Sequence, residues 1–190
     1  QLDGVGGWDI YSFLLHDDAK PERVLFLKGE LINENGRFFG DVELEIKNMS
    51  TNEITIVKVN SGTYVSSLTL SADDDVLITI KKEGFAFKSV YISANDTSFS
   101  SPSNLNFELN SLEQGRSFNL NDIYFESNSF QINLVAKNVL FEFADYLKLN
   151  KNIEIEINGF TDNVGESIVN QILSENRAKA VYELLISYGF

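Results

Sequence analysis

The chain of 190 residues has no cysteine, so neither disulfide bonds nor thiolate metal sites are available to it. It is also short of positive charge, with 15 Lys and Arg against 28 Asp and Glu and a formal net charge of -13. Because no basic cluster is present, we expect no nucleic-acid partner and no adsorption to anionic lipid. No apolar run approaches the length of a membrane span, and no signal peptide is visible at Gln1.

Histidine is almost absent, which bears on catalysis. His16 is the single histidine, and no metal-binding or acid–base partner lies at a suitable spacing from it. We therefore interpret His16 as exposed and without a functional role, and the many serines lack a base. No glycine-rich phosphate loop follows an expected strand, so we expect no enzyme, no metal and no cofactor.

Acidic residues are plentiful, and two groups of them invite a functional interpretation. Glu154 and Glu156 share one face of an expected strand, where a solvated face is a simpler explanation than a glycosidase pair. Asp73, Asp74 and Asp75 are consecutive, whereas calcium loops space their ligands on alternate positions. We therefore expect a solvated turn at the three aspartates.

Hydrophobic residues make up 43% of the chain, which is enough for one or two globular cores. Between residues 24 and 110 they form short runs, several rich in β-branched residues, separated by turn signals such as Asn33-Glu-Asn-Gly36. Runs that recur at steps of about ten residues are typical of a β-sandwich. The expected strands are residues 24–32, 42–46, 53–59, 63–70, 76–80, 90–93 and 105–109.

This region, residues 24–110, resembles the carboxypeptidase-regulatory, transthyretin-like β-sandwich. The residues that carry the likeness are Lys28-Gly29, the strand from Asp41 to Ile46, Ser61-Gly-Thr-Tyr64 and Lys82-Glu-Gly-Phe85. In that family the module is not catalytic, and the resemblance implies a spacer or a contact surface. A carbohydrate-binding sandwich is a second possibility that needs exposed aromatic side chains on a strand face. The candidates are Tyr64, Phe85, Phe87 and Tyr91.

The N-terminal residues 1–15 contain Gly6-Gly-Trp-Asp-Ile-Tyr11, which predicts a turn into one strand. The run resembles the end of a TolB-type β-propeller blade, which implies a remnant strand of an upstream propeller. An ordinary edge strand is the alternative. Residues 16–23 are polar, contain Pro21 and predict a linker.

A second domain is expected at residues 117–190, so that the whole chain is a two-domain β plus α/β protein. Residues 118–125 predict a strand, and residues 133–149 carry apolar residues at helical steps. Ile alternates with Glu at residues 153–157, which predicts a half-buried strand. The order β-α-β-α places both helices on one face of a sheet. The second helix, residues 167–188, has an apolar stripe of Ile168, Leu173, Val181, Leu184, Leu185 and Tyr188.

The turn between the last strand and the last helix is the candidate site. Asp162 lies in this turn, residues 158–165, and its side chain can accept bonds from nearby backbone N–H groups. Asn170, Ser174 and Arg177 follow at spacings of four and three, so they share a helix face that can point at the turn. An Asp and an Arg facing one cleft suit a zwitterionic ligand. A structural ion pair that orients the turn is the alternative.

The same stretch resembles the peptidoglycan-binding OmpA C-terminal-like domain. In that family a strand ends in Gly-His-Thr-Asp-Asn-x-Gly, and Asn and then Leu-Ser-x-x-Arg-Ala follow on the next helix. An earlier family strand resembles Ile123-Tyr-Phe-Glu126. The residues in the corresponding positions are Gly159, Phe160, Thr161, Asp162, Asn163, Val164, Gly165, Asn170, Leu173, Ser174, Arg177 and Ala178.

The resemblance implies a ligand and the residues that bind it. Asp162 and Arg177 would hold the amino-acid end of diaminopimelate in the peptidoglycan stem peptide, with lesser contacts from Asn170, Thr161 and Asn163. Two features depart from the family pattern. Phe160 replaces the usual His, and the family pattern continues past the last residue here, so we expect an incomplete domain with an open sheet edge.

We therefore expect a non-catalytic periplasmic protein that anchors an outer-membrane assembly to the cell wall. The order of propeller strand, sandwich and OmpA-like domain resembles multidomain envelope lipoproteins, some of which are similar to a peptidoglycan-binding subunit of the type IX secretion apparatus. The implied partners are the peptidoglycan stem peptide and envelope or secretion-system proteins. The alternative is a protein–protein scaffold whose OmpA-like domain has lost ligand binding, which Phe160 favours.

Overall fold

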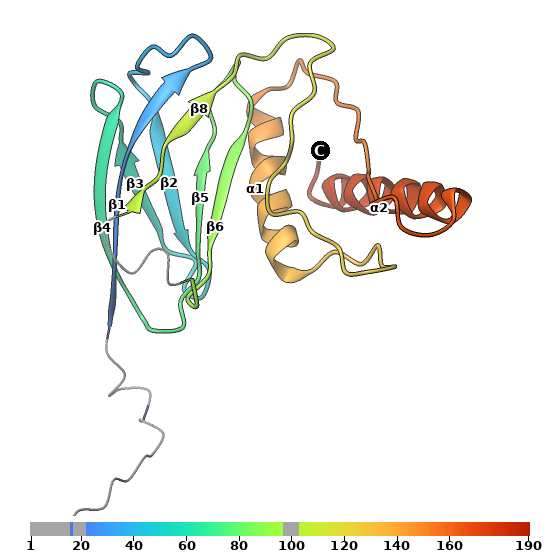
Figure 1. Ribbon diagram of the computed structural model, residues 1–190. Coiled ribbons are helices and arrows are strands. Elements are labelled where there is room, and N and C mark those ends of the chain that lie inside the picture. Colours follow the sequence, from blue (N-terminus) through green and yellow to red (C-terminus); the bar gives the residue numbers. More distant parts are fainter. Residues whose placement is uncertain (1–15, 17–21, 97–102) are drawn as a thin grey trace, which may run out of the picture.

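The computed structural model describes residue 16, residues 22–96 and residues 103–190. A β-sandwich comes first along the chain, and two helices follow it (Figure 1). The strand expected within residues 1–15 and most of the linker at residues 16–23 lie outside the described residues. His16 is exposed, as expected.

The sandwich consists of two four-stranded sheets. In the first sheet β1 pairs antiparallel with β4 and parallel with β7 and β8, and in the second sheet every pairing is antiparallel, in the order β3-β2-β5-β6. All seven expected strands are present with small shifts at their ends. The strands are β1 (Arg23–Asn33), β2 (Glu43–Asn48), β3 (Ile54–Lys58), β4 (Thr63–Leu70), β5 (Val76–Ile80), β6 (Lys88–Ile92), β7 (Ser103–Asn104) and β8 (Phe107–Leu109).

The core between the sheets follows from the alternation of apolar side chains along the strands. Leu25 and Leu27 of β1 face Leu44 and Ile46 of β2, and all four are buried. Full burial of such a side chain contributes about 1.5–3 kcal/mol, so this cluster is the main source of the sandwich's stability. In β5 the alternation fails, because all five residues are buried. A second apolar layer must therefore cover the outer face of that sheet.

Gly29 allows a loop to cross the first sheet. It lies inside β1, as the expected strand at residues 24–32 implies. A Cβ at Gly29 would be 2.0 Å from the carbonyl oxygen of Leu105 and 2.9 Å from the ring of Tyr64. The buried Tyr64 hydroxyl donates to that same carbonyl oxygen. Because Gly29 has no side chain, Leu105 can approach β1 closely enough for the Tyr64 hydroxyl to bond its carbonyl oxygen.

The helices α1 (Leu134–Leu149) and α2 (Ser167–Ser187) lie where the periodicity predicts them. Asn133 caps α1 by accepting a hydrogen bond of 2.8 Å from the backbone N–H of Ala136. In the described part of the chain, no helix is apolar over enough of its length to cross a membrane.

The strands predicted at residues 118–125 and 153–157 are not formed, and no strand is described after β8. The predicted sheet beneath the two helices is therefore wrong for this structure. The alternation at residues 153–157 has a different basis, since Ile153 and Ile157 pack against the apolar cluster around α1 without a neighbouring strand. An alternating pattern reports which side chains are buried, and it does not supply the partner that a β-ladder requires.

α1 forms the missing layer over the second sheet of the sandwich (Figure 1). Its Phe143 and Tyr146 rings lie 5.4 and 5.6 Å from the ring of Phe87, and Leu77 of β5 belongs to the same buried cluster. The hydroxyl of Tyr146 donates to the carbonyl oxygen of Phe85 at 2.6 Å. The helix expected to cover a sheet of its own domain therefore covers the sandwich, which explains why β5 is buried on both faces.

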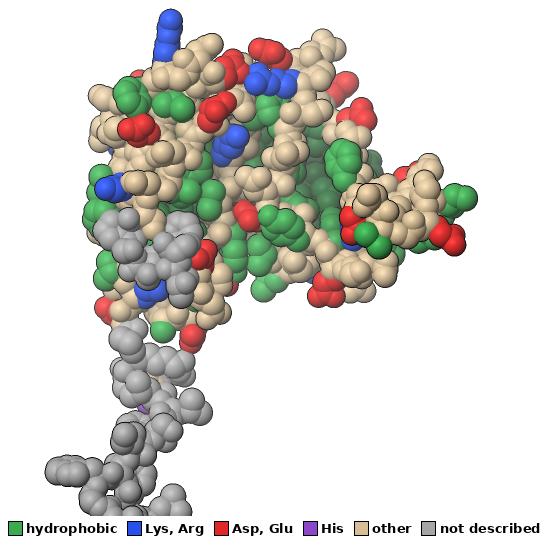
Figure 2. Space-filling model, in the orientation of Figure 1, with side chains coloured by type: hydrophobic (Ala, Val, Ile, Leu, Met, Phe, Trp, Pro, Cys, Tyr) green, Lys and Arg blue, Asp and Glu red, His purple; other side chains and the backbone are tan. Residues whose placement is uncertain are grey.

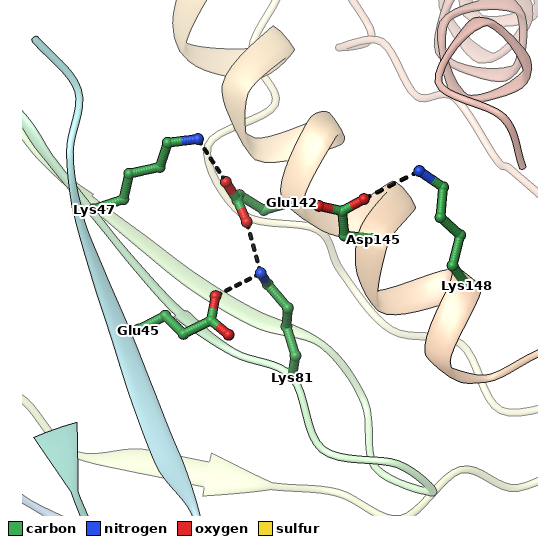
Figure 3. A network of polar contacts seen from close by, with 6 residues as sticks. All are labelled: Glu45, Lys47, Lys81, Glu142, Asp145 and Lys148. Atoms are coloured by element: carbon green, nitrogen blue, oxygen red, sulfur yellow. Dashed lines mark hydrogen bonds and ion pairs between the residues drawn. The ribbon is translucent and has the colours of Figure 1, made fainter. Parts of the chain in front are cut away.

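A buried ion network joins α1 to the same sheet (Figure 3). Glu142, only 4% exposed, accepts from Lys47 Nζ at 2.9 Å and from Lys81 Nζ at 2.7 Å. Lys81 also donates to Glu45 at 2.6 Å. Burial acts to lower the pKa of Lys81, but the hydrogen bonds to Glu142 and Glu45 outweigh it and hold this pKa above its usual value. Each buried charge is therefore paired, as a low-dielectric interface requires.

Two of the three aspartates at positions 73–75 are structural, and the expectation of a solvated turn is wrong for these two. Asp74 is buried and accepts hydrogen bonds of 2.9 Å from Asn48 Nδ2 and from the backbone N–H of Ser71. Asp75 accepts from the Tyr91 hydroxyl and from the backbone N–H of Ala94. Among the described residues, no group of three or more His, Cys, Asp or Glu side chains could hold a metal ion.

The ion network predicts a large effect of Glu142→Ala on stability. This substitution leaves Lys47 and Lys81 at the interface without their shared carboxylate, which should lower the free energy of unfolding by about 3–5 kcal/mol. Urea denaturation followed by circular dichroism would measure it. The control is Asp145→Ala on the same helix, where an exposed pair with Lys148 is lost and a change below about 0.5 kcal/mol is expected. Equally small effects would contradict the docking of α1 on the sandwich.

The buried tyrosines predict a loss of stability at alkaline pH. Burial raises the pKa of Tyr146 to about 12, and burial also raises the pKa of Tyr64. For both groups the folded pKa exceeds the unfolded value of about 10, so the stability is fully present below pH of about 10 and is lost as pH rises through the folded pKa. Urea denaturation at a series of pH values should show this decline, and tyrosinate absorbance should develop in part above pH of about 11. A single titration near pH of about 10 with constant stability would contradict the burial.

Candidate functional site

The turn at residues 158–165 lies directly on α2, and Gly159 makes this possible. A Cβ at Gly159 would be 2.2 Å from the carbonyl oxygen of Ser174 and 3.2 Å from the backbone nitrogen of Ala178. No side chain fits between the two segments. The glycine thus sets the distance from the turn to the helix that carries Arg177.

Asn170 fastens the rest of the turn to α2. Its Nδ2 donates to the carbonyl oxygens of Asp162 at 3.2 Å and Val164 at 3.0 Å. The backbone N–H of Val164 in turn donates to Asp162 Oδ1 at 3.3 Å. Thr161 is half-buried and Asn163 is exposed. Asn170 therefore acts on the backbone that presents Asp162, and the ligand contact that the family resemblance implies for it stays a prediction.

Arg177 bonds three carbonyl oxygens that belong to two backbone segments. Its Nε donates to the carbonyl oxygen of Ser129 at 3.0 Å, Nη1 to that of Phe160 at 3.3 Å and Nη2 to that of Glu126 at 3.1 Å. The guanidinium also lies over the ring of Phe125, 5.1 Å from its centroid. Nη1 and Nη2 each keep a second N–H that these bonds do not use. Arg177 is half-buried, so its guanidinium is fixed in place and still partly open to solvent.

Asp162 and Arg177 are brought to the same turn without pairing with each other. In the described part of the chain, the Asp162 carboxylate is exposed and accepts from Val164, while Arg177 bonds to carbonyl oxygens. The alternative interpretation, an ion pair that orients the turn, is therefore not what the structure forms. An exposed carboxylate on this turn can accept hydrogen bonds from an ammonium group, and a fixed guanidinium on the adjacent helix can donate to a carboxylate.

The sequence missed two parts of this arrangement. Phe125 and Glu126 were assigned to a strand, whereas their segment supplies a ring and a carbonyl group to Arg177. Ile168 was placed in the buried stripe of α2, but it is 72% exposed. The buried residues of α2 are Val181 and Leu185. Spacing identified the face of the helix that carries Asn170 and Arg177, but it could not identify which apolar residues find a neighbour.

Two cavities lie elsewhere in the described structure, away from Asp162 and Arg177. The larger one, about 750 Å³, is lined by residues 153–157, by Ala178, Lys179, Tyr182 and Leu185 of α2 and by Phe190. The smaller one, about 290 Å³, lies between the end of β8 and residues 117–121 and has a polar lining. Neither contains Asp162 or Arg177, so neither adds to the site described above.

The aromatic residues proposed for a carbohydrate-binding face do not form one. Tyr64 and Phe87 are buried, and Phe85 and Tyr91 are half-buried. Phe85 packs on Phe39, with the ring centroids 4.8 Å apart, and Tyr91 donates to Asp75. These rings support the fold, and they offer no exposed strand face for a sugar.

The family that matches the chain covers its C-terminal part, which contains the candidate site. Residues 124–190 match the model of the OmpA family, so this part of the chain is OmpA-like, and such domains generally bind peptidoglycan. No curated protein matches the chain. A solved structure that is similar is the 3-chlorocatechol 1,2-dioxygenase from Rhodococcus opacus 1CP, with 13% identity and a TM-score of 0.36, over 50% of this chain and 62% of that chain. A TM-score this low bears on neither fold nor function.

The close approach at Gly159 predicts that Gly159→Ala displaces the turn from α2. The added methyl group collides with backbone, which cannot move aside cheaply, so we expect the free energy of unfolding to fall by about 1–3 kcal/mol. The backbone amide of Val164 should shift in NMR spectra and exchange faster. Gly40→Ala is the matched control, because a Cβ there meets nothing within 4 Å. Unchanged spectra in both variants would show that the turn is not seated on the helix.

Proposed function

We propose that the protein is a non-enzymatic periplasmic protein that binds peptidoglycan through the diaminopimelate of the stem peptide and anchors an outer-membrane assembly to the wall. The observation that carries the proposal is an exposed Asp162 carboxylate on a turn whose Phe160 carbonyl is bonded by the fixed Arg177 guanidinium. Gly159 allows this turn to lie on α2, and Asn170 bonds it there. The family match of residues 124–190 supports the same class of ligand.

In this mechanism each charged group of the ligand meets its complement. The unused N–H groups of Arg177 donate to the carboxylate at the free end of diaminopimelate, and Asp162 accepts from the adjacent ammonium. A charge-assisted hydrogen bond contributes about 1.5–3 kcal/mol. The Phe125 ring and the three carbonyl oxygens fix the guanidinium before the ligand arrives, which lowers the entropic cost of binding. Thr161 and Asn163 flank the ammonium side of the site.

The sandwich has a supporting role in this proposal. We assign residues 24–110 to a transthyretin-like, carboxypeptidase-regulatory module that acts as a spacer and as a contact surface for other envelope or secretion-system proteins. Its second sheet is bound to α1 through Glu142 and Tyr146. A wall-bound turn on α2 is therefore connected to the sandwich through packed structure, as an anchor that bears a load requires.

A protein–protein scaffold is the second candidate. The observation that favours it is that Arg177 already bonds three carbonyl oxygens and stacks on Phe125, which is sufficient reason for an Arg at this position without a ligand. The exposed Phe160 in place of the family's His favours it as well.

Co-sedimentation of the 190-residue chain with purified peptidoglycan sacculi separates the two candidates. Asp162→Asn keeps an oxygen that can accept from Val164 and removes the charge that an ammonium needs. We expect it to weaken binding about tenfold or more, corresponding to the loss of one charge-assisted bond. Asp145→Asn, an equally conservative change at a half-buried residue of α1 whose side chain pairs with Lys148, should leave binding unaltered.

Arg177 needs a separate control because it also supports the fold. Arg177→Lys keeps the positive charge and loses the planar fork, so its effect on wall binding is to be compared with its effect on the free energy of unfolding. A folded parent that stays in the supernatant would reject wall binding and leave the scaffold as the function.

A further inference from the structure

Three apolar side chains close to Asp162 in sequence are open to solvent. Phe160 is 79% exposed, Val164 74% and Ile168 72%. Of the large hydrophobic residues described, Leu134 alone matches this exposure above 70%, so three of the four most exposed lie within nine positions of sequence around one carboxylate. Exposed apolar side chains that gather in one place usually mark a contact surface. Figure 2 shows hydrophobic side chains beside acidic ones at the outer end of the α2 region.

The backbone under these side chains is held in place by the site itself. The carbonyl oxygen of Phe160 accepts from Arg177, and that of Val164 accepts from Asn170. The N–H of Val164 donates to Asp162, and Ile168 lies in the first turn of α2 directly after the anchored segment. The three side chains are thus presented by the same structure that presents the charged groups.

We propose that Phe160, Val164 and Ile168 form an apolar rim that binds the methylene chain of the amino-acid residue whose charged end lies between Asp162 and Arg177. This inference rests on the proposed function and deepens it, because it makes the site selective for a zwitterion on a long aliphatic chain. A zwitterionic head alone is common to all free amino acids. Because the rim contacts the methylene groups of the ligand, it distinguishes a seven-carbon diamino acid from amino acids with short side chains.

Charge favours such a ligand over other occupants of the rim. Asp162 and Glu166 are exposed within it, in a chain of net charge -13. An anionic membrane is repelled by these carboxylates, and a second copy docked rim to rim would bring like charges together. A ligand with an ammonium group next to its aliphatic chain satisfies both the carboxylate and the apolar side chains.

Titration with free amino acids of increasing length tests the rim. Glycine, 2-aminobutyrate, norleucine and meso-diaminopimelate would be added to the 190-residue chain, with NMR shifts of the residue 160–170 amides as the readout. We expect affinity to rise by up to about fourfold for each methylene group that the rim covers. Val164→Ser and Ile168→Ser should flatten this dependence and keep the binding of glycine. Val65→Ser, at an exposed residue of β4, is the matched control and should change nothing.

The possible outcomes distinguish a failure of the rim proposal from a failure of the proposed function. Equal affinity for all four ligands, unaltered by Val164→Ser and Ile168→Ser, overturns the rim and leaves the charged site standing. No binding of diaminopimelate by the folded parent overturns both. A concentration-dependent dimer that Ile168→Ser abolishes assigns the rim to a second copy of the chain and overturns its role in ligand selection.

Discussion

The contact between α1 and the outer face of the second sheet is the interaction on which the rest of the structure depends. It buries Leu77 and Phe87 under Phe143 and Tyr146, and it places Glu142 between two lysines. Without it, β5 would expose an apolar face and α1 would expose the other half of the same cluster. Because α2 and the segments around residues 120–132 and 153–157 pack on α1 in turn, the candidate site takes its position from this contact.

The candidate site is held by hydrogen bonds from side chains to backbone carbonyl groups more than by pairs of side chains. Arg177 bonds carbonyl oxygens from two segments that are distant in sequence, and Asn170 bonds two more in the turn. These bonds leave Asp162 without a cationic partner in the described structure. A site built like this is already in place before a ligand binds, and under the proposed function the same residues serve the fold and recognition. For this reason a mutation at Arg177 cannot be interpreted from binding data alone.

Much of the fold was predictable because local patterns carry it. The strands of the sandwich follow from short alternating runs between turn residues, such as the turn closed by Gly36, and α1 follows from apolar residues at helical steps after the cap at Asn133. The strands predicted around residues 123 and 155 failed, since a strand exists only where another strand pairs with its backbone. Likewise Ile168 has the spacing of a core residue, but no neighbouring element covers it.

The sequence by itself determined the strands of the sandwich, the two helices and the residues of the OmpA-like motif, because each depends on neighbours a few positions away. It also determined that Asn170 and Arg177 share one face of the helix, and that this face can point at the turn that contains Asp162. Only the tertiary structure decided that α1 covers the sandwich, that Asp74 and Glu142 are buried, and that Arg177 bonds carbonyl oxygens instead of Asp162. These outcomes depend on which segments, distant in sequence, come into contact. Burial and charge pairing result from such contacts, and a local sequence pattern does not contain them.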